Sequence, residues 1–442
     1  MVDRIPKALV INPWVADFKL YDEWMHPVGL YFLISLLRYN KWDITYINCL
    51  ASDTTKKNKR YNANNFPNIQ ITKPAVYGKI PRRYKRYGIS EDSLRRQLAR
   101  APAPDIIFIG SGMTYWIDGL IATVTILSDY FPDTRIIIGG ISSSLIADIL
   151  KKRIQNGYIF SGTLFGSLDK LKKMHPYLYN LTAGGWRPTL KDALELLDTH
   201  AHGPVLTSLG CPYNCSYCAS SYLQPKFVIR PLATVIGEME YLIEHFGIQD
   251  FALYDDALLY QADKNFLPLA RAIKDLKASV RLHAPNGLHV RYFQPPILEA
   301  MRETGFVTIR LGYESGSKKH QRDTDKKTSR AQLSSKIDLI KSAGFSIHDI
   351  GVYIMAGLPE QNVNDVLDDV AFVASCGVTI KPVFLSPVPQ TPIFDFYARQ
   401  FPQLKNDPLT HNDIFFITLL PQWDIATVEE VIKRSRQYNN LL

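Results

Sequence analysis

Short apolar runs alternate with helical stretches in two separate sets along the chain, and this alternation restricts the fold more than any other feature. Strands buried on both faces are continuous apolar runs, and neighbouring parallel strands need helical connections. The first set contains expected strands at 7–13, 43–50, 105–110, 135–140 and 157–161, with helices at 29–39 and 118–131. Residues 1–165 therefore predict an α/β domain with a doubly wound, Rossmann-like parallel sheet.

The second set contains six strand and helix repeats. Strands are expected at 204–209, 249–254, 280–284, 306–312, 348–355 and 379–386, and helices at 231–246, 263–277, 294–304, 328–343 and 363–376. Six such repeats predict a partial (β/α)6 barrel over residues 201–390. Residues 166–200, which contain two adjacent glycines and a proline, are expected to be a linker. Residues 391–442 are expected to be a short, mostly helical tail.

The size and composition favour two or three folded domains. A chain of 442 residues exceeds the usual size of one hydrophobic core, and 46% of its residues are hydrophobic. No apolar run reaches the roughly 20 residues of a membrane-spanning helix. The first residues also lack the charged-then-apolar order of a signal peptide. We therefore expect a cytoplasmic protein without a membrane span.

A basic segment follows the second expected strand. Residues 51–100 are expected to be an insertion into the first domain, with 13 Lys and Arg between residues 56 and 100. Four tyrosines accompany them: Tyr61, Tyr77, Tyr84 and Tyr87. This combination is compatible with binding of RNA or an acidic substrate, and the alternative is a solvated insertion. Because no RNA-binding motif is present, we do not expect nucleic acid as a partner.

Three of the five cysteines lie within eight residues. Cys211, Cys215 and Cys218 form a C-x3-C-x2-C motif on the loop after the first barrel strand. A sparse and odd number of cysteines does not resemble a disulfide framework, so this group indicates a metal or redox site. Cys49 and Cys376 have apolar neighbours and are expected to be buried thiols.

Three thiolates at this spacing suit an iron–sulfur cubane. They can ligate three irons of a [4Fe–4S] cluster and leave the fourth iron open for a small chelating molecule. A zinc site is the alternative, but structural zinc usually has four ligands in two pairs. The sequence offers no second pair near the motif. The motif therefore predicts a cluster with one open iron.

On these residues the chain resembles the radical S-adenosylmethionine (SAM) superfamily. The aromatic residue that the family has before the last cysteine is Tyr217, and the resemblance extends from residue 204 to about residue 392. It implies that SAM binds the open iron through its amino and carboxylate groups, with Tyr217 near the adenine. It also implies an electron donor such as flavodoxin or ferredoxin, and an organic substrate that the sequence does not identify.

The resemblance also implies SAM contacts after two later strands. Asp255 and Asp256 follow the second barrel strand, where the family often has an acidic pair that contacts the substrate amino group. A helix N-cap role for one of these aspartates is the alternative. Glu314 and Ser315 lie in a stretch that resembles the family's Gly-x-Glu-Ser-Gly-Ser, which implies contact with the ribose or carboxylate.

The last two barrel strands add further similarity. Tyr353 and Met355 lie in a strand that resembles the family's glycine-rich fifth strand, which implies packing against adenine. After the sixth strand the family usually has Pro-Gly-Thr, whereas Gln390 replaces the glycine here. The motif therefore does not predict the conformation of this turn.

The first domain resembles the cobalamin-binding subclass of the same family. Three strings carry this resemblance: His26-Pro27-Val28-Gly29-Leu30, Ser111-Gly112-Met113-Thr114-Tyr115 and Ile138-Gly139-Gly140-Ile141. The resemblance implies cobalamin as a third cofactor. It implies contacts to cobalamin at Pro13, Trp14, Ser111, Met113, Thr114, Tyr115, Gly139, Gly140 and Gly162.

The sequence departs from the cobalamin pattern in two places. His26 occupies the position of the cobalt-ligating histidine of classical carriers, but Trp24 stands where their orienting aspartate would be. The radical subclass generally lacks this ligand, so we expect His26 not to bind cobalt. After the fifth strand, the subclass's Gly-Glu-Gly-Glu is replaced by Gly162-Thr163-Leu164-Phe165.

Three functions follow from these resemblances and motifs. The leading hypothesis is a cobalamin-dependent radical methylase, in which a 5′-deoxyadenosyl radical abstracts hydrogen from an unactivated carbon that then receives a methyl group. A radical cyclisation, rearrangement or oxidation, with or without cobalamin, is the first alternative. The second alternative is a nucleic-acid-binding module with a structural cluster.

The cluster hypothesis predicts that Cys215→Ala abolishes cluster assembly, because only three protein ligands are available to the cubane. The measurement is iron content, visible absorbance and 5′-deoxyadenosine formation after anaerobic reconstitution with iron and sulfide. Cys49→Ala serves as the control and should retain all three. Unchanged iron content in Cys215→Ala would refute the assignment of the motif.

Overall fold

The chain divides into two compact units. The computed structural model describes residues 4–22, 24–51, 66–197, 202–317, 319–320 and 328–442. Unit 1 comprises Met1–Ala201 with Asn406–Thr410, and unit 2 comprises His202–Lys405 with His411–Leu442. Among the described residues, no helix combines the length and apolar character needed to cross a membrane.

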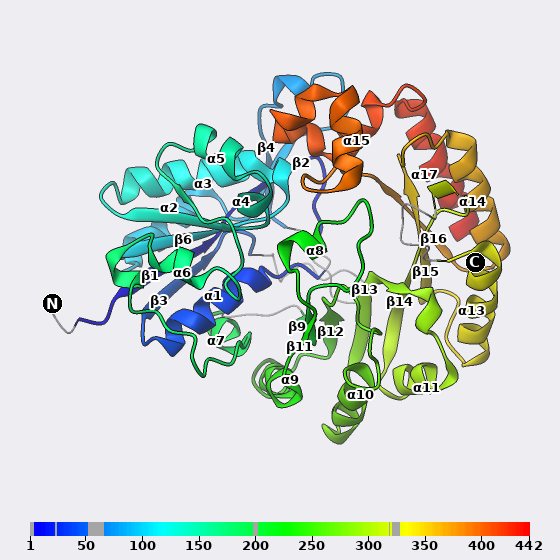
Figure 1. Ribbon diagram of the computed structural model, residues 1–442, viewed down its shortest axis with the longest axis horizontal. Helices are drawn as coiled ribbons and strands as arrows, with labels where there is room; N and C mark the ends of the chain where they lie inside the picture. Colours follow the sequence, from blue (N-terminus) through cyan, green and yellow to red (C-terminus); the bar gives the residue numbers. More distant parts are fainter. Residues whose placement is uncertain (1–3, 23, 52–65, 198–201, 318, 321–327) are drawn as a thin grey trace. The chain divides into compact units, whose positions relative to one another are not determined.

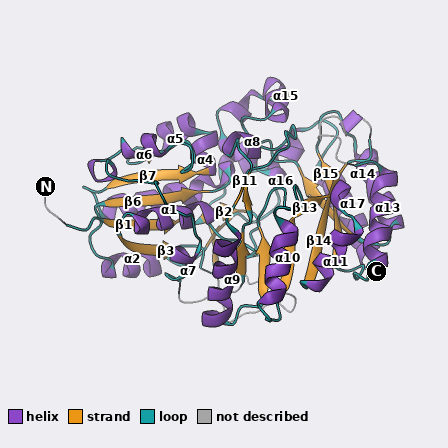
Figure 2. Ribbon diagram, turned by 60° about the horizontal axis from the view of Figure 1, so that its bottom comes forward, coloured by secondary structure: helices purple, strands orange, loops and turns teal. Residues whose placement is uncertain are grey.

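Unit 1 is built on a five-stranded, fully parallel sheet. Its order is β3-β1-β6-β7-β8, with β1 Lys7–Asn12, β3 Asp43–Asn48, β6 Ile106–Ser111, β7 Arg135–Gly140 and β8 Tyr158–Ile159. Figure 2 shows helices on both faces of these strands. They are α1 Val28–Tyr39, α2 Glu91–Arg100, α3 Ile117–Tyr130, α4 Ile141–Leu145 and α5 Ala147–Arg153. The predicted doubly wound sheet is therefore confirmed.

The strand order of unit 1 fixes where a ligand fits. The side on which strands are added changes between β1 and β6, because β3 lies on one side of β1 and the later strands lie on the other. Ligands of doubly wound sheets bind beyond the carboxyl ends of the strands, at this switch point. The loops after β1, β6 and β7 therefore form the expected ligand-binding edge.

The segment that we expected to be a linker contains short helices of unit 1. They are α6 Leu168–Lys172, η3 Pro176–Leu178 and α7 Lys191–Leu194. Leu190, Ala193 and Leu194 are completely buried, and α7 packs against α1. The indole N–H of Trp186 donates to the hydroxyl of Ser35 on α1 at 3.1 Å. These residues are therefore part of the core of unit 1.

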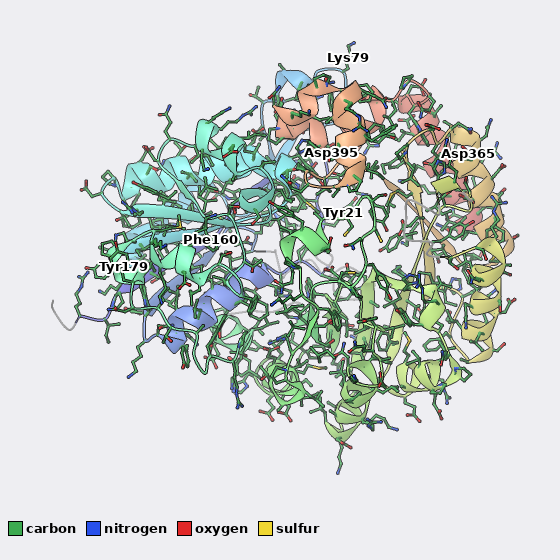
Figure 3. All side chains as sticks on the ribbon, viewed as in Figure 1. Tyr21, Lys79, Phe160, Tyr179, Asp365 and Asp395 are labelled. Carbon is green, nitrogen blue, oxygen red and sulfur yellow. The ribbon has the colours of Figure 1, made fainter. Side chains whose placement is uncertain are left out.

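The basic segment forms a small antiparallel sheet in the order β2-β5-β4. The strands are β2 Val15–Asp17, β4 Asn68–Gln70 and β5 Lys85–Tyr87, and η1 Ala75–Tyr77 lies between β4 and β5. Tyr77, Tyr84 and Tyr87 are buried, whereas Lys79 is exposed and points outward (Figure 3). Tyr61 and the basic residues of 52–65 lie outside the described residues.

Unit 2 is built on an open six-stranded parallel sheet in the order β16-β15-β14-β13-β12-β9. The strands are β9 Gly203–Val205, β12 Asp250–Leu253, β13 Arg281–His289, β14 Phe306–Glu314, β15 Ile350–Ala356 and β16 Thr379–Phe384. They follow each other in chain order and do not close, which confirms the predicted partial barrel.

Helices cover one face of this sheet, as Figure 1 shows. They are α9 Leu232–Phe246, α10 Phe266–Asp275, α11 Pro295–Glu303, α13 Arg330–Ser342 and α14 Val363–Ser375. The first expected strand is shorter than predicted, because the chain leaves the sheet after β9. The next residues form β10 (Ser208–Leu209), which pairs antiparallel with β11 (Val228–Ile229).

The tail beyond β16 belongs to unit 2 except for residues Asn406–Thr410, which belong to unit 1. Its elements are α15 Pro392–Gln400, η5 Pro402–Lys405, η6 Pro408–His411, α16 Asp413–Phe416, η7 Ile417–Leu419 and α17 Ile425–Asn439. The Asn439 side chain accepts from the N–H of Ile380 at 2.7 Å and donates to its carbonyl at 2.9 Å. An amide from α17 thus satisfies backbone groups of β16, which lies at the edge of the sheet.

A buried polar cluster ties the amino-terminal ends of β12, β13 and β14 together. Asp250 accepts two bonds from Arg281, at 2.6 and 2.5 Å, and one from Nε2 of His283 at 3.1 Å. Nδ1 of His283 lies 2.9 Å from the hydroxyl of Thr308. Burial alone would raise the pKa of Asp250, but the bonds from His283 and Arg281 outweigh it and lower this pKa to about 2.

Asp250→Asn should destabilise unit 2 by about 2 kcal/mol. This loss of unfolding free energy is smaller than the ~3–5 kcal/mol expected when a fully buried ion pair is broken, because the Arg281 side chain remains 39% exposed. A lowered carboxyl pKa contributes stability above the unfolded pKa of about 4 that is lost as pH falls towards 2. Chemical denaturation at pH 7 and pH 3 measures both effects. Equal stability of Asp250→Asn and the exposed control Asp263→Asn would contradict this account.

Candidate active site

The cysteine motif lies on a loop at the carboxyl end of the unit 2 sheet. The loop begins after β10 and ends before α8 (Ser220–Leu223). All five cysteines lie in the described part of the chain and stand as thiols, and Cys49 and Cys376 are buried as predicted. The N–H of Cys218 donates to the carbonyl of Cys215 at 3.0 Å, so a tight turn joins the last two thiols of the motif.

A cluster and a single metal ion place different demands on the three thiols. In the part of the chain that the structure describes, no three Cys, His, Asp or Glu side chains converge as ligands of one ion. Zinc would hold its sulfur ligands about 2.3 Å from one centre. A cubane gives each thiolate a separate iron, so the three sulfurs can stand farther apart.

The protonation of the motif also depends on the metal. Burial is the largest cause that raises the pKa of Cys211 to about 11, and the neighbouring Asp256, Cys218 and Cys215 raise it further. The mutual effect of the three thiols shows that they are electrostatic neighbours. Iron bound to the motif would favour the thiolate forms and oppose this shift, because coordinating thiols are deprotonated.

Asp255 anchors the segment that leads into the cysteine loop. Its carboxylate accepts from the hydroxyl of Thr207 at 2.6 Å, from the N–H of Thr207 at 3.0 Å and from the hydroxyl of Ser208 at 2.5 Å. Burial raises the pKa of Asp255, and these bonds oppose the rise. The carboxylate is therefore occupied by Thr207 and Ser208, which lie just before the motif.

A buried ion pair holds the same segment from another direction. The Arg230 guanidinium donates to the carbonyl of Leu206 at 2.7 Å and to the carboxylate of Glu238 on α9 at 2.6 Å. Both side chains are almost completely buried. The N–H of Arg230 also donates to the carbonyl of Thr207 at 2.8 Å. Three consecutive residues before the loop, 206–208, are thus held by Asp255, which follows β12, and by Arg230, which follows β11.

Asp256 differs from its neighbour in being exposed to solvent. Surrounding protein atoms nevertheless raise the pKa of its carboxyl group, and a bond with Ser220 opposes the rise. Of the two aspartates, Asp256 is therefore the one whose carboxylate is accessible to a ligand beside the cysteine loop.

Glu314 connects the end of β14 to the cysteine loop. The hydroxyl of Tyr217 donates to the Glu314 carboxylate at 3.0 Å. Burial is the largest cause that raises the pKa of Tyr217 well above its ordinary value, and the charge of Glu314 adds to it. Tyr217 is therefore a neutral donor, fixed directly before Cys218. The structure brings these two predicted SAM-contacting residues together.

Ser315 is held by a buried carboxylate on α14. Its hydroxyl donates to Asp369 at 3.1 Å and also lies 3.3 Å from the N–H of Ser317. Ser315 is 1% exposed. Its side chain thus shapes the loop after β14, and the structure gives it no exposed surface for direct contact with a ligand.

Tyr353 and Met355 lie two residues apart on β15, and so on one face of the sheet. Met355 is 8% exposed. The Tyr353 hydroxyl donates to the carbonyl of Pro285 on β13 at 2.7 Å. The Tyr353 side chain therefore crosses β14, the strand between β15 and β13. These contacts place Tyr353 against an irregular part of β13.

A β-bulge in β13 is a site feature that the sequence analysis missed. Between Ala284 and Leu288, three residues of β13 stand opposite a single residue of β14. Asn286 and Gly287 are exposed there, although β13 is an internal strand that pairs with β12 and β14. The Asn286 amide donates to the carbonyls of Tyr254 and Asp255 at 3.0 and 3.3 Å. Bulges often lie beside active sites, and Pro and Gly inside a strand were the available signal.

Gln390 keeps the backbone conformation of the glycine that it replaces. Its φ is +69°, in the left-handed region that favours glycine. The following Thr391 caps α15, and the N–H of Ile393 donates to the carbonyl of Ser216 at 3.0 Å. The turn after β16 therefore packs against the cysteine loop without a glycine.

The residues expected to contact cobalamin lie along the carboxyl edge of the unit 1 sheet, but their exposure differs. Pro13, Trp14, Ser111 and Thr114 are buried, Tyr115, Gly139 and Gly162 are half-buried, and Met113 and Gly140 are exposed. Trp14 is 1% exposed, and its indole N–H donates to the carbonyl of Ile89 at 2.8 Å. The Trp14 side chain therefore has a packing role in this structure.

Packing within the protein explains why glycine occupies positions 140 and 162 at this edge of the sheet. A Cβ on Gly140, where φ is +112°, would lie 2.5 Å from the carbonyl oxygen of Ser111. A Cβ on Gly162, where φ is +135°, would lie 2.3 Å from the Ser167 hydroxyl. Close packing between neighbouring loops explains both residues without a ligand.

Exposed apolar side chains follow three adjacent strands at this edge. Met113 after β6, Ile141 after β7 and Phe165 after β8 are 45%, 41% and 40% exposed. Phe165 stacks on Trp186 with 5.7 Å between ring centroids and an interplanar angle of 12°. We call Met113, Ile141 and Phe165 the apolar rim. Phe165 belongs to the string that departs from Gly-Glu-Gly-Glu, so an aromatic ring takes the place of charged residues there.

His26 makes a local contact near the start of α1. Its Nδ1 lies 3.0 Å from the hydroxyl of Tyr31. Burial raises the pKa of Tyr31 far above its ordinary value, so this hydroxyl stays neutral. The expectation that His26 does not bind cobalt remains a prediction.

Comparison with known proteins identifies the second unit. Residues 205–373 match the Radical SAM superfamily, a range that contains the cysteine loop and the strands β12, β13, β14 and β15. This segment is a radical SAM domain. The radical SAM domain implies a [4Fe–4S] cluster and SAM as cofactors, and Cys211, Cys215 and Cys218 supply the three thiols that such a cluster needs.

Two curated relatives of this radical SAM protein are methyltransferases by name. An uncharacterized methyltransferase of Pyrococcus horikoshii is 26% identical over 197 residues, which cover 44% of this chain and 41% of that protein. The bacteriochlorophyllide d C-12(1)-methyltransferase of Chlorobaculum tepidum is 24% identical over 273 residues, covering 59% and 55%. The chain spans about half the length of the curated relatives that it matches.

The structural similarity extends beyond the radical SAM domain, because one solved structure matches most of both units of this chain. The radical SAM methyltransferase TsrM from Kitasatospora setae superposes with a TM-score of 0.63 at 15% identity, over 89% of this chain and 76% of that one. At this identity the similarity shows a shared fold. A Rossmann-like unit followed by a radical SAM barrel is therefore a known arrangement.

Asp255→Asn should lower iron retention of the reconstituted radical SAM domain, whereas Asp256→Asn should not. An amide at position 255 cannot accept from all the donors of Thr207 and Ser208, and an unsatisfied buried group costs about 1–3 kcal/mol. Iron content after gel filtration and the thermal unfolding midpoint measure the effect. Similar behaviour of the two variants would contradict the anchoring role of Asp255.

Proposed function

We propose that this protein is a cobalamin-dependent radical SAM methylase that acts on an unactivated carbon. The observation that carries the proposal is the apolar rim, at the ligand-binding edge of a doubly wound unit, in a chain that also has a radical SAM domain. Exposed apolar patches mark binding sites for apolar surfaces. A corrin ring offers such a surface.

Related proteins support the same proposal. TsrM from Kitasatospora setae has been solved with cobalamin and a [4Fe–4S] cluster bound. The relative from Chlorobaculum tepidum is named for methylation at a carbon position of a bacteriochlorophyllide. Both properties belong to those proteins, and they extend to this chain only through the present proposal.

The protein's own residues would bind and orient SAM beside the cysteine loop. Cys211, Cys215 and Cys218 would hold the cluster, and the accessible carboxylate of Asp256 would pair with the SAM ammonium. When bound, the cluster supplies the electron that cleaves SAM, and cobalamin supplies the methyl group. Asp255 would contribute by positioning the loop.

The remaining predicted residues would define the rest of the SAM site. Glu314 would accept from a ribose hydroxyl while it also holds Tyr217. Tyr353 and the exposed bulge of β13 would line the inner face of the sheet. Placement of the substrate carbon and exclusion of water are the tasks of these side chains, because the cofactors carry the bond-breaking chemistry.

A radical cyclisation, rearrangement or oxidation is the second candidate, since the same radical SAM site serves it. The nucleic-acid alternative loses support from the basic segment. The rings of Tyr77, Tyr84 and Tyr87 are 1%, 2% and 4% exposed. Buried rings cannot stack on bases, which is the usual contribution of aromatic residues to binding of single strands.

Anaerobic reconstitution with iron, sulfide and hydroxocobalamin tests the proposal. After desalting, the protein should retain about one corrin per chain, measured by its visible spectrum. Met113→Glu should lower corrin retention roughly tenfold, because a buried charge against an apolar ligand is costly. Its iron content should not change, since Met113 lies in unit 1 and the cysteine motif in unit 2.

Two outcomes would contradict the proposed cobalamin-dependent function. Absence of retained corrin in the wild-type protein would defeat cobalamin dependence and favour the second candidate. Equal corrin retention in Met113→Glu, Met25→Glu and the wild type would show that the apolar rim is not the binding surface. Met25→Glu is the matched control because Met25 packs instead beside the cluster of Val15, Leu50, Phe66 and Tyr87.

A further inference from the structure

Glu314 has an unusual backbone conformation. Its φ is +66°, and the N–H of Ser315 donates to the carbonyl of Tyr313 at 2.9 Å. A bond between residues i and i+2 around a central residue of positive φ defines the rare, strained form of the γ-turn. A glutamate adopts it only where the surrounding structure enforces it.

One carboxylate contacts the chain on both sides of Glu314. Asp369 on α14 accepts from the Tyr313 hydroxyl at 3.0 Å, from the Ser315 hydroxyl at 3.1 Å and from the N–H of Gly316 at 2.9 Å. Asp369 lies one helical turn after Asp365, which Figure 3 labels on α14. We call these contacts the Asp369 clamp.

The clamp is buried and closely packed. Asp369 is 1% exposed, and its charge is balanced by Arg330 at 2.9 Å. A Cβ on Gly316 would lie 2.2 Å from the Tyr313 hydroxyl and 2.5 Å from Asp369, so only glycine fits beneath the carboxylate. Each Asp369 oxygen accepts two bonds, which leaves the loop no alternative arrangement with the same partners.

The clamp acts on a residue at the candidate SAM site. Glu314 lies between the residues that Asp369 holds, and its own carboxylate accepts from Tyr217, next to Cys218. The position of Glu314 therefore depends on α14, whose Asp369 lies outside the cysteine loop. Ser315 was the one residue of the clamp expected from sequence to contact SAM, and Asp369 itself was not a candidate.

We propose that Asp369 is a positioning residue for SAM binding: it enforces the strained turn that directs Glu314 towards both Tyr217 and the ligand. This inference rests on the proposed function, because it takes SAM as the ligand of Glu314. It assigns to a helix residue a role that motif comparison does not provide.

Asp369→Asn is the direct test. The amide is isosteric, but either of its orientations sets an NH2 group against Arg330 or the Gly316 N–H, which can only donate. With the cluster oxidised, equilibrium dialysis against SAM should show about tenfold weaker binding, while iron content stays at the wild-type level. In dithionite-driven 5′-deoxyadenosine formation, KM for SAM should rise by the same factor, with kcat within about twofold.

Asp368→Asn is the matched control, since it makes the same charge change at an exposed position of the same helix. It should bind SAM as the wild type does. A lowered unfolding midpoint in Asp369→Asn with unchanged SAM affinity, measured well below that midpoint, would assign the clamp a purely structural role and overturn the proposal. Loss of iron in parallel with SAM binding would also overturn it.

A second variant covers the case in which Asp369→Asn does not fold. Tyr313→Phe removes one bond of the clamp with little change in packing volume, and it should weaken SAM binding about threefold. Unchanged affinity in this variant would then refute the proposal. If the wild-type protein does not bind SAM, the proposed function is refuted, and not only the role of the clamp. In that case the Asp368→Asn control will not bind SAM either.

Discussion

Parallel pairing of consecutive strands is the constraint on which the site in unit 2 depends. Each of the six strands returns through a helix, so all their carboxyl ends lie along one edge of the sheet. The cysteine loop, Asp256, the Asn286 bulge and Glu314 are far apart in sequence but follow neighbouring strands. A site built this way needs only local loop geometry to bring its members within reach of one ligand.

Buried carboxylates supply that local geometry. Asp255 holds the segment before the cysteine loop, and Asp369 holds the turn around Glu314. A left-handed residue other than glycine costs about 1–3 kcal/mol, which hydrogen bonds to a buried charge can offset. The motif residues are thus supported by acids whose carboxylates bind the protein backbone and side chains, and direct contact between Asp255 and SAM stays a prediction.

The sequence was sufficient for most elements of the two parallel sheets, because apolar periodicity reports burial, but not for the short helices of residues 166–200 or the small antiparallel strands. The strand expected at 135–140 is β7, and the helix expected at 231–246 is α9. The bulge at Asn286, the γ-turn at Glu314 and the left-handed Gln390 could not be predicted from it. Each of these depends on distant partners, such as Tyr254, Asp369 and Ser216, whose proximity appears only once the sheet has formed.

Residues 406–410 have a consequence for how the chain can be divided. They belong to unit 1, where Leu409 accepts from the hydroxyl of the buried Tyr77 and Asp407 pairs with Arg153, yet they lie within the tail of unit 2. The backbone therefore passes from one unit to the other three times. Expression of residues 1–201 alone would therefore omit part of unit 1. Unit 1 is discontinuous in sequence, although all strands of its parallel sheet come from one continuous segment.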